Sequence, residues 1–450
     1  MNSDPRFRTW GQVSRETTSG DEILEGYKMT ELGPLPEEWR VAKLGEVLEE
    51  VDERVSDCDD PMAKNLPVLS LTKNEGLILQ TNRFNKRIAT EDVSNYKIVR
   101  QGHIVYNPYV IWEGAIHILR KYKAGLVSPV YPVLKAKEKI ADPCYLDAWL
   151  RTPSAIAAYN RFAAGAVNRR RAIRKRDFWR IQLPLPPLPE QRAIAHVLRT
   201  VQRAKEATER VIAALRELKK SLMKHLFTYG PVPLDQADQV PLKETEIGPV
   251  PEHWEVVQLG EILKLRKGTI HPDEVPNARY VGLEHLDSGK IWIRRFGKAS
   301  DTKSAKAVFE TGDILYGKLR PYLDKAALAE WDGVCSTDIL VLTPQDDFDA
   351  VFTAYLIHSS FVLAHAVATT TGVNHPRTSW RALKQAAIPL PPLEEQHEIA
   401  RILQTVDRKI EAEENRKRAL EALFKTLLHH LMTAKLRVPP KLIAEVTVRE

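Results

Sequence analysis

Two long stretches of the chain place apolar residues at every third or fourth position and contain neither glycine nor proline. The first runs from Glu190 to Phe227 and predicts one helix of 38 residues, roughly 57 Å long at about 1.5 Å per residue. Its apolar residues repeat by seven, as do those of a second stretch near the C-terminus, which is typical of a coiled coil. The predicted seam comprises Ile194, Val197, Val201, Val211, Leu215, Leu218 and Leu222 in the first helix and Ile399, Ile402, Val406, Leu420 and Leu427 in the second.

Polar residues interrupt this seam halfway along each helix. They are Thr208 in the first helix and Glu413, Arg416 and Lys417 in the second. The first helix leads away from one globular region and the second returns from another, so we predict an antiparallel pair whose midpoints meet. A helix that packs on its own globular domain is the alternative explanation of the same pattern.

The chain repeats itself. From Thr30 to Leu48, 12 of 19 residues are identical to those from Thr245 to Leu263, and from Leu183 to Phe227, 23 of 45 residues are identical to those from Ile388 to Met432. The sequence therefore predicts two tandem copies of one unit of roughly 210 residues.

Each copy begins with short apolar runs separated by Gly, Pro and Asn, which indicate strands with some helix. A Pro-Leu-Pro-Pro-Leu segment, which cannot be helical, then precedes the long helix. We predict a mixed α+β fold in which two globular domains are joined by two long antiparallel helices with a pseudo-two-fold internal repeat. The expected divisions are a tail at 1–28, domains at 29–182 and 245–387, helical regions at 183–228 and 388–436, a linker at 229–244 and a tail at 437–450.

The composition favours a soluble globular protein, with 43% hydrophobic residues, a net charge of +7 and no apolar run long enough to span a membrane. The polar N-terminal residues lack the apolar region of a signal peptide, so we expect a cytoplasmic protein with no membrane association. Cys58, Cys144 and Cys335 lie far apart and form neither a disulfide framework nor a metal-binding spacing. No metal site is expected.

Three fragments imitate catalytic motifs. The spacing from Gly312 to Lys318 is that of a phosphate-binding loop, but Leu319 stands where Ser or Thr must bind magnesium, which favours a strand and a turn. The segment Asn107-Pro108-Tyr109 lacks the double proline of an adenine methyltransferase motif. His397 and Glu398 could begin a zinc-protease helix, but Arg401 replaces the second histidine. We therefore expect no catalytic residues in this chain.

Positive charge is the more informative signal. Six basic residues lie within the eight from 169 to 176, a density that suits phosphate binding although a solvated surface is the plain alternative. Arg and Asn can also read guanine and adenine edges in the major groove. The candidate DNA contacts are Asn107, Tyr109, Asn168, Arg169, Arg170, Arg171, Arg174, Lys175 and Arg176 in copy one and Arg294, Arg295, Lys298, Lys318, Arg320, Asn374, His375 and Arg377 in copy two.

The repeated motifs resemble those of the specificity subunits of type I restriction-modification systems. The likeness rests on Pro-Leu-Pro-Pro-Leu-x-Glu-Gln at 184–191 and 389–396 and on Gly-Pro-x-Pro-Glu-x-Trp at 33–39 and 248–254. Residues 105–108, 114–116 and 125–131 are similar to the family's internal pattern, from which copy two departs at 333–338. The resemblance covers residues from about 29 to 438.

This resemblance implies a non-catalytic subunit with two target recognition domains, 29–182 and 245–387, which bind the two halves of a bipartite double-stranded DNA sequence. The helices would set the gap between the halves. Two modification subunits and two restriction subunits would be its partners and would supply S-adenosylmethionine, ATP and Mg²⁺ chemistry, whereas this chain binds no cofactor. The implied docking residues are Pro186, Pro187, Glu190, Gln191, Pro391, Pro392, Glu395 and Gln396.

Two other classes of protein fit parts of the pattern. A DNA-binding regulator, or a coiled-coil scaffold, could use the same pair of helices without a methyltransferase partner. A free-standing enzyme built on the loop from Gly312 to Lys318 is the weakest of the alternatives.

Overall fold

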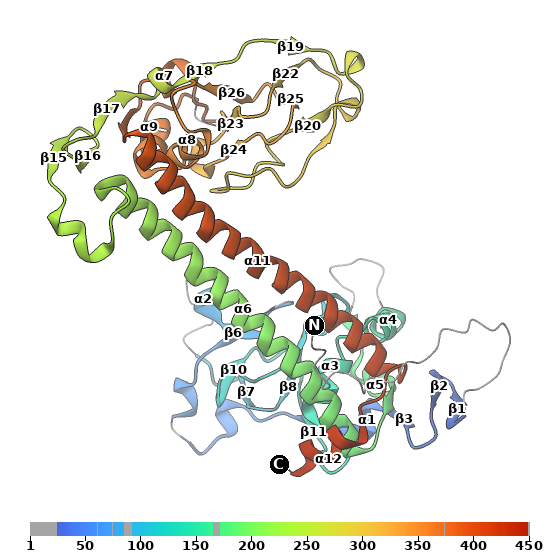
Figure 1. Cartoon of the computed structure of the whole chain (residues 1–450). Helices are drawn as coiled ribbons and strands as arrows, with labels where there is room; N and C mark the ends of the chain where they lie inside the picture. Colours follow the sequence, from blue (N-terminus) through green and yellow to red (C-terminus); the bar gives the residue numbers. More distant parts are fainter. Residues whose placement is uncertain are drawn as a thin grey trace. The chain divides into compact units, whose positions relative to one another are not determined.

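The structure is a computed structural model that describes residues 25–448, apart from 61, 74, 85–91, 165–171 and 373. Its contacts divide the chain into two units. The first unit contains residues 1–206 and 418–450, and the second contains residues 207–417. The two long helices of Figure 1, α6 (Leu188–Tyr229) and α11 (Leu393–Met432), each contribute residues to both units.

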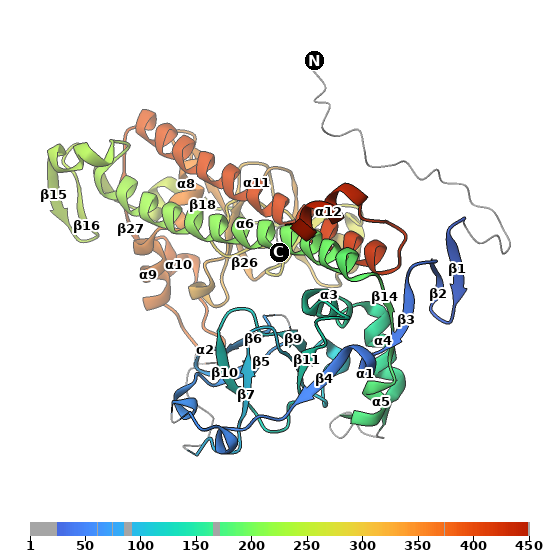
Figure 2. The same cartoon turned by 90° about the horizontal axis from the view of Figure 1, so that it is seen from below.

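The first unit begins with the hairpin β1 (Tyr27–Thr30) and β2 (Gly33–Pro36). Its central antiparallel sheet has the strand order β4-β11-β8-β9, and the shorter pairs are β10-β7, β5-β6 and β12-β13. The strands are β3 (Arg40–Lys43), β4 (Leu48–Val51), β5 (Leu69–Leu71), β6 (Leu77–Leu79), β7 (Lys97–Arg100), β8 (Ile104–Tyr106), β9 (Ile116–Ile118), β10 (Ala124–Val127), β11 (Val133–Ala136), β12 (Ala163–Ala164), β13 (Ala172–Ile173) and β14 (Gln182–Leu185). The helices are α1 (Leu44–Val47), α2 (Gln80–Phe84), α3 (Pro143–Trp149), α4 (Pro153–Phe162), α5 (Lys175–Trp179) and the C-terminal α12 (Pro440–Val448), which lies beside α6 (Figure 2).

The second unit repeats this plan. The hairpin of β15 (Leu242–Thr245) and β16 (Gly248–Pro251) matches β1-β2, and the sheet β18-β26-β23-β24 matches β4-β11-β8-β9. A five-stranded sheet of order β19-β22-β25-β20-β21 completes the domain. Its strands are β17 (Glu255–Gln258), β18 (Leu263–Leu265), β19 (Thr269–Ile270), β20 (Arg279–Val281), β21 (Gly297–Lys298), β22 (Lys306–Phe309), β23 (Ile314–Gly317), β24 (Ala326–Leu328), β25 (Gly333–Cys335), β26 (Ile339–Pro344) and β27 (Ala387–Leu390), and its helices are α7 (Leu259–Ile262), α8 (Ala350–Ile357), α9 (Ser360–Ala368) and α10 (Trp380–Leu383).

The Pro-Leu-Pro-Pro-Leu segments enter strands before their helices begin. Strand β14 pairs with β3 so that Leu183 lies opposite Ala42, and β27 pairs with β17 in the same antiparallel way. Because the two repeated motifs of each copy are hydrogen-bonded to each other, every domain closes on itself at the point where its long helix departs.

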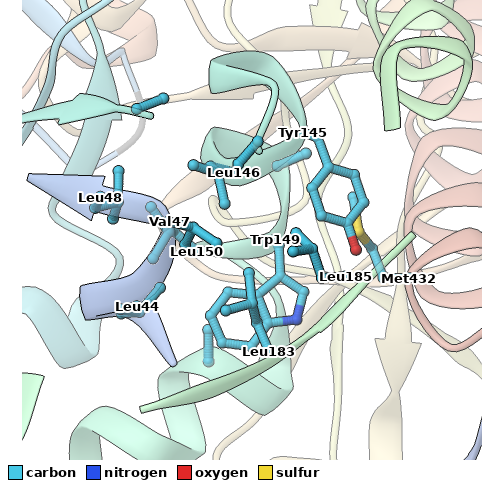
Figure 3. Packing of buried hydrophobic residues seen from close by; sticks show 14 of the residues in the cluster. Leu44, Val47, Leu48, Tyr145, Leu146, Trp149, Leu150, Leu183, Leu185 and Met432 are labelled. Carbon is cyan, nitrogen blue, oxygen red and sulfur yellow. The ribbon is translucent and has the colours of Figure 1, made fainter. Parts of the chain in front are cut away.

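The core of the first unit gathers side chains from segments that are far apart in the sequence. Leu44, Trp149 and Leu183 pack together, and Met432 from the end of α11 joins them (Figure 3). Full burial of a large apolar side chain contributes about 2 kcal/mol. The end of α11 is therefore part of the first domain's core.

The helices pair in an antiparallel coiled coil, as the sequence predicted. In the first unit Val197 of α6 packs near Leu427 and Leu431 of α11. In the second unit Lys417 forms an ion pair with Glu209 at 3.0 Å, and Asp407 forms one with Lys219 at 2.8 Å. From the first ion pair to the second, the position advances by ten residues in α6 and goes back by ten residues in α11, so the helices run antiparallel. The contact between Lys417 and Glu209, which is next to Thr208, confirms that the polar midpoints meet.

Two residues of the predicted seam, Val211 and Leu218, do not face the other helix. Val211 and Leu218 are 42% and 47% exposed. Their neighbours Ile212 and Lys219 face the other helix instead, because the heptad alternates steps of three and four residues. The observed row of α6 contains Lys205 and Lys219, and these two charged residues interrupt its apolar pattern in the sequence. The seam of α6 is Ile194, Leu198, Val201, Lys205, Thr208, Ile212, Leu215, Lys219, Leu222 and Leu226, and that of α11 is Ile399, Leu403, Val406, Ile410, Glu413, Lys417, Leu420, Phe424, Leu427 and Leu431.

No single helix of the described residues is long and apolar enough to cross a membrane. One bent pair within the described ranges, α8 and α9 taken together, reaches that length and apolarity, with an angle of 54° between its helices. Both belong to the hydrophobic core of the second unit.

Candidate nucleic-acid interface

The second unit brings five predicted DNA contacts together from two distant segments. The connection from β23 to β24 carries Lys318 and Arg320, and the segment between α9 and α10 carries the other three. The Arg320 N–H donates to the Pro376 carbonyl at 2.7 Å, and the Thr378 N–H donates to the Lys318 carbonyl at 3.0 Å. The five residues that share this surface are Lys318, Arg320, Asn374, His375 and Arg377, all exposed except the half-buried Lys318.

The backbone of these segments holds the side chains in place. Arg377 forms a β-bridge with Leu319 on one side and with Thr371 on the other. Its guanidinium lies 3.4 Å from Asp338, while Arg320 makes no ion pair within the described chain. The surface therefore presents cations on a braced backbone, an arrangement suited to phosphate contacts.

The first unit uses the equivalent connection, from β8 to β9. The Ile173 N–H donates to the Pro108 carbonyl at 3.2 Å, which joins this connection to the segment between α4 and α5. The Asn107 side chain accepts a hydrogen bond from the Tyr109 N–H at 3.0 Å and so fixes the start of the loop. Arg174, Lys175 and Arg176 follow directly and are exposed, although Lys175 also pairs with Glu50 at 2.5 Å.

Four predicted contacts in this segment lie outside the described residues. They are Asn168, Arg169, Arg170 and Arg171. Their role stays a prediction from the sequence.

Three predicted contacts of the second unit belong to a different surface. Arg294 lies 3.2 Å from Glu330 and 3.1 Å from Glu411 of α11, and Arg295 lies 2.7 Å from Asp287. Lys298 is exposed on β21. Arg294 and Arg295 already pair with carboxylates, so a DNA phosphate would have to compete with these ion pairs for them.

The Glu-Gln pair of each repeated motif proves to be an internal clamp. Glu190 accepts a hydrogen bond from the Trp39 indole at 2.9 Å and ion-pairs with Arg437 at 2.8 Å. Gln191 accepts from the Asp142 N–H at 2.9 Å and donates to the Pro186 carbonyl at 2.8 Å. Burial opposes the charge of Arg437, but the carboxylates of Glu190 and Glu38 outweigh it and raise the pKa of Arg437.

The second copy repeats the clamp with one change of partner. Glu395 accepts from the Trp254 indole at 3.0 Å, and Gln396 accepts from the Asp349 N–H at 3.1 Å. His253 takes the place of Arg437, at 2.7 Å from Glu395. Gly230 ends α6 beside this clamp with φ of 82°, where a β-carbon would lie only 3.2 Å from the Glu395 carboxylate.

These contacts place most of the implied docking residues inside the chain. Six of the eight residues make contacts within the chain and are not available to a partner. The buried ones are Pro186, Glu190, Gln191, Pro391 and Gln396, and Glu395 is half-buried in its clamp. Pro187 and Pro392 alone of the predicted docking residues are exposed. The sequence missed Arg437, which lies in the C-terminal tail and has no counterpart in the first repeat.

The described residues contain no group of three or more His, Cys, Asp or Glu side chains that could hold a metal ion. Strand β23, which ends at Gly317, pairs with β24 and β26, so the residues with phosphate-loop spacing form part of a sheet.

Fold and motifs define a tandem-repeat protein in which two like domains share a pair of long helices. Comparison with known proteins agrees. A family model described as "Type I restriction modification DNA specificity domain" matches residues 251–422. The chain is 26% identical over 422 residues to the type I restriction enzyme MjaVIII specificity subunit of Methanocaldococcus jannaschii, covering 90% of this chain and 94% of that one.

Two further comparisons extend this result. The EcoDI specificity subunit of Escherichia coli is 27% identical over 254 residues, which is 51% of this chain and 55% of the relative. The crystal structure of the type I restriction-modification S subunit from M. genitalium superposes with a TM-score of 0.55 at 14% identity, covering 88% of this chain and 96% of the other, and shares its fold.

Over most of its length the chain is similar to the specificity subunits of type I restriction-modification systems. Its role is that of such a subunit, which determines DNA target recognition within the restriction-modification complex. It is the non-catalytic chain of that complex and carries no cofactor itself.

Proposed function

We propose that the two target recognition domains, 29–182 and 245–387, each read one half of a bipartite DNA sequence. The observation that carries this proposal is the recurrence of one loop pair in both domains. In each, a connection between two antiparallel strands is hydrogen-bonded to the segment that precedes a short helix. Phosphate contacts would come from Arg174 in the first domain and from Arg320 in the second. Arg176 and Arg377 would assist them, although each lies 3.4 Å from a carboxylate, that of Asp177 or Asp338.

The helical regions, 183–228 and 388–436, would set the distance between the two half-sites. A helix of 42 residues such as α6 is about 63 Å long, and equivalent positions on one face of B-DNA recur about every 34 Å. A rod of this length can hold two domains one turn or more apart. The ion pairs along its antiparallel seam would stiffen the rod and so support its use as a ruler.

Two modification subunits and two restriction subunits would complete the assembly in the cytoplasm. They would supply adenine methylation with S-adenosylmethionine and DNA translocation and cleavage with ATP and Mg²⁺. With the Glu-Gln pairs occupied inside the chain, docking would fall to the exposed prolines, Pro187 and Pro392, and to the outer faces of the helices.

Methylation sequencing tests this proposal directly. The chain is expressed with a modification subunit in cells that lack other adenine methyltransferases, and all methylated adenines are mapped. We expect one motif of two short specific halves separated by a gap of constant length. Methylation at a single uninterrupted motif, or none at all, would contradict the bipartite proposal.

A further inference from the structure

Both domains hold a half-exposed tyrosine in the same connection of the same sheet. The connection from β8 to β9 and that from β23 to β24 each contain nine residues between the paired strand ends. Tyr109 in the first is 48% exposed and Tyr322 in the second is 54% exposed. A proline, Pro108 or Pro321, precedes each tyrosine.

The sequence hides this correspondence. Counted from the equivalent strand residues Tyr106 and Tyr316, Tyr109 is the third residue and Tyr322 is the sixth, so an alignment without gaps does not match them. The structure shows that the two tyrosines occupy equivalent places, because the hydrogen bonds around them match. In both domains the X-Pro-Tyr segment is hydrogen-bonded to the chain just before the short helix, through Ile173 to Pro108 and through Arg320 to Pro376.

The second loop is braced in a conformation that L-residues disfavour. Arg320 and Asp324, on either side of Pro321–Leu323, have φ values of 52° and 48°. The Asp324 N–H donates to the Pro321 carbonyl at 2.9 Å, and the Asp324 carboxylate lies 2.6 Å from His358 Nδ1. Such strain persists only where the surrounding structure fixes it, and here it directs Tyr322 outward.

Neither tyrosine side chain is used inside the described chain. Their phenol groups make no hydrogen bond and their rings contact no other ring or cation in that part of the chain. A fixed loop that holds an aromatic ring half in water, beside free cations such as Arg320, has the character of a contact surface. Aromatic rings suit this use because they provide large contact areas at low conformational cost.

We propose that Tyr322 contacts a base of the second half-site and is the counterpart of Tyr109 in the first. Each ring packs against a base step, and the cations beside it hold the flanking phosphates. Aromatic rings stack on bases whatever their sequence, and apolar wedges between base steps are common in DNA-binding proteins. This inference rests on the proposed reading of one half-site by each domain.

Binding of the full complex to its target duplex tests the role of the ring. We expect Tyr322→Ala to weaken binding about 10-fold or more, the effect typical of a lost base–aromatic contact. Tyr322→Phe should stay within about twofold of wild type, because the contact uses the ring and not the hydroxyl. The dependence of affinity on salt should not change, since the ring neutralises no phosphate.

Phe296 provides a matched control. It is 50% exposed in the same domain but already packs against Trp331 and Arg279. Phe296→Ala should leave target affinity unchanged. An equal loss in Phe296→Ala and Tyr322→Ala would overturn the specific role of Tyr322.

Fluorescent base analogues separate the two half-sites. With 2-aminopurine placed in one half at a time, Tyr322→Ala should abolish the binding-induced signal in the second half only, and Tyr109→Ala in the first half only. Wild-type affinity and signals in Tyr322→Ala would refute the inference while leaving the bipartite proposal intact. A wild-type complex with no preference for a bipartite duplex would instead remove the proposed function itself.

Discussion

The indole of Trp39 donates a hydrogen bond to the carboxylate of Glu190 at 2.9 Å across 151 positions of the chain. Trp254 does the same to Glu395 at 3.0 Å in the second copy. In each domain the first repeated motif is thus hydrogen-bonded to the second, and the long helix starts from a fixed point. A rigid helix can set a distance between two domains only if its ends are fixed in this way.

Removal of the Glu190 carboxylate should loosen this attachment. Glu190→Ala leaves the buried Trp39 indole without an acceptor and takes a partner from Arg437, so we expect the free energy of unfolding to fall by about 2 kcal/mol. Thermal unfolding of the purified chain measures the change. Glu217→Ala, which removes an exposed carboxylate of the same helix, is the control and should change little. Equal stability of the two variants would show that the clamp contributes nothing.

The corrected seam predicts opposite results for two adjacent residues. Ile212 is 6% exposed and Val211 is 42% exposed. Ile212→Asp should destabilise the helix pair by about 3 kcal/mol or more, because it buries an unpaired carboxylate. Val211→Asp should lie within about 0.5 kcal/mol of wild type. Denaturant titration distinguishes the two, and the reverse order would restore the row that the sequence suggested.

The arginines of the second domain should divide into two functional groups. Arg320 makes no ion pair within the described chain, so Arg320→Ala should weaken binding to all DNA sequences and reduce the salt slope by about 0.9 log unit per lost phosphate contact. Arg294→Ala should leave the slope unchanged, since its guanidinium is already paired with Glu330 and Glu411. Binding measured over a range of salt concentrations provides both slopes. A reduced slope in the Arg294 variant would contradict this division.

Lengthening both helices by one heptad should lengthen the recognised gap. Insertion of seven residues after Thr208 in α6 and after Lys417 in α11 keeps the seam in register and adds about 10 Å, or roughly 3 base pairs at about 3.4 Å each. Methylation sequencing reports the new gap. The same insertion in α6 alone breaks the register and should abolish stable complex formation. A gap that stays constant in the double insertion would disprove the ruler.

Much of the architecture could be predicted because it depends on local pattern. The heptads predicted two long helices, and the predicted ends of the first lie within two residues of its observed limits at Leu188 and Tyr229. Internal identity predicted two like domains, and the structure repeats the sheet order and the hairpin in both. The order of these elements along the chain also favoured the antiparallel pairing that Lys417 and Glu209 confirm.

The candidate interface was only partly predictable. Lys318 and Arg377 were predicted as DNA contacts because of their charge. Nothing in the sequence indicated that their two segments lie side by side, or that Arg294 forms ion pairs with Glu330 and Glu411. Charge in a sequence does not distinguish a cation that faces solvent from one that a carboxylate neutralises. That distinction requires the distances between segments that only folding brings together.

Residue order alone was enough to predict the repeat, the two helices and the likeness to type I specificity subunits, because identity and heptad periodicity are properties of residue order. The folded chain was needed to show which row of α6 forms the seam, because Lys219 is acceptable there once Asp407 lies opposite it. It also decided that Glu190 faces inward, because Trp39 and Arg437 converge on it from positions 151 and 247 residues away. Such contacts follow from chain topology, which residue order specifies only through the complete fold.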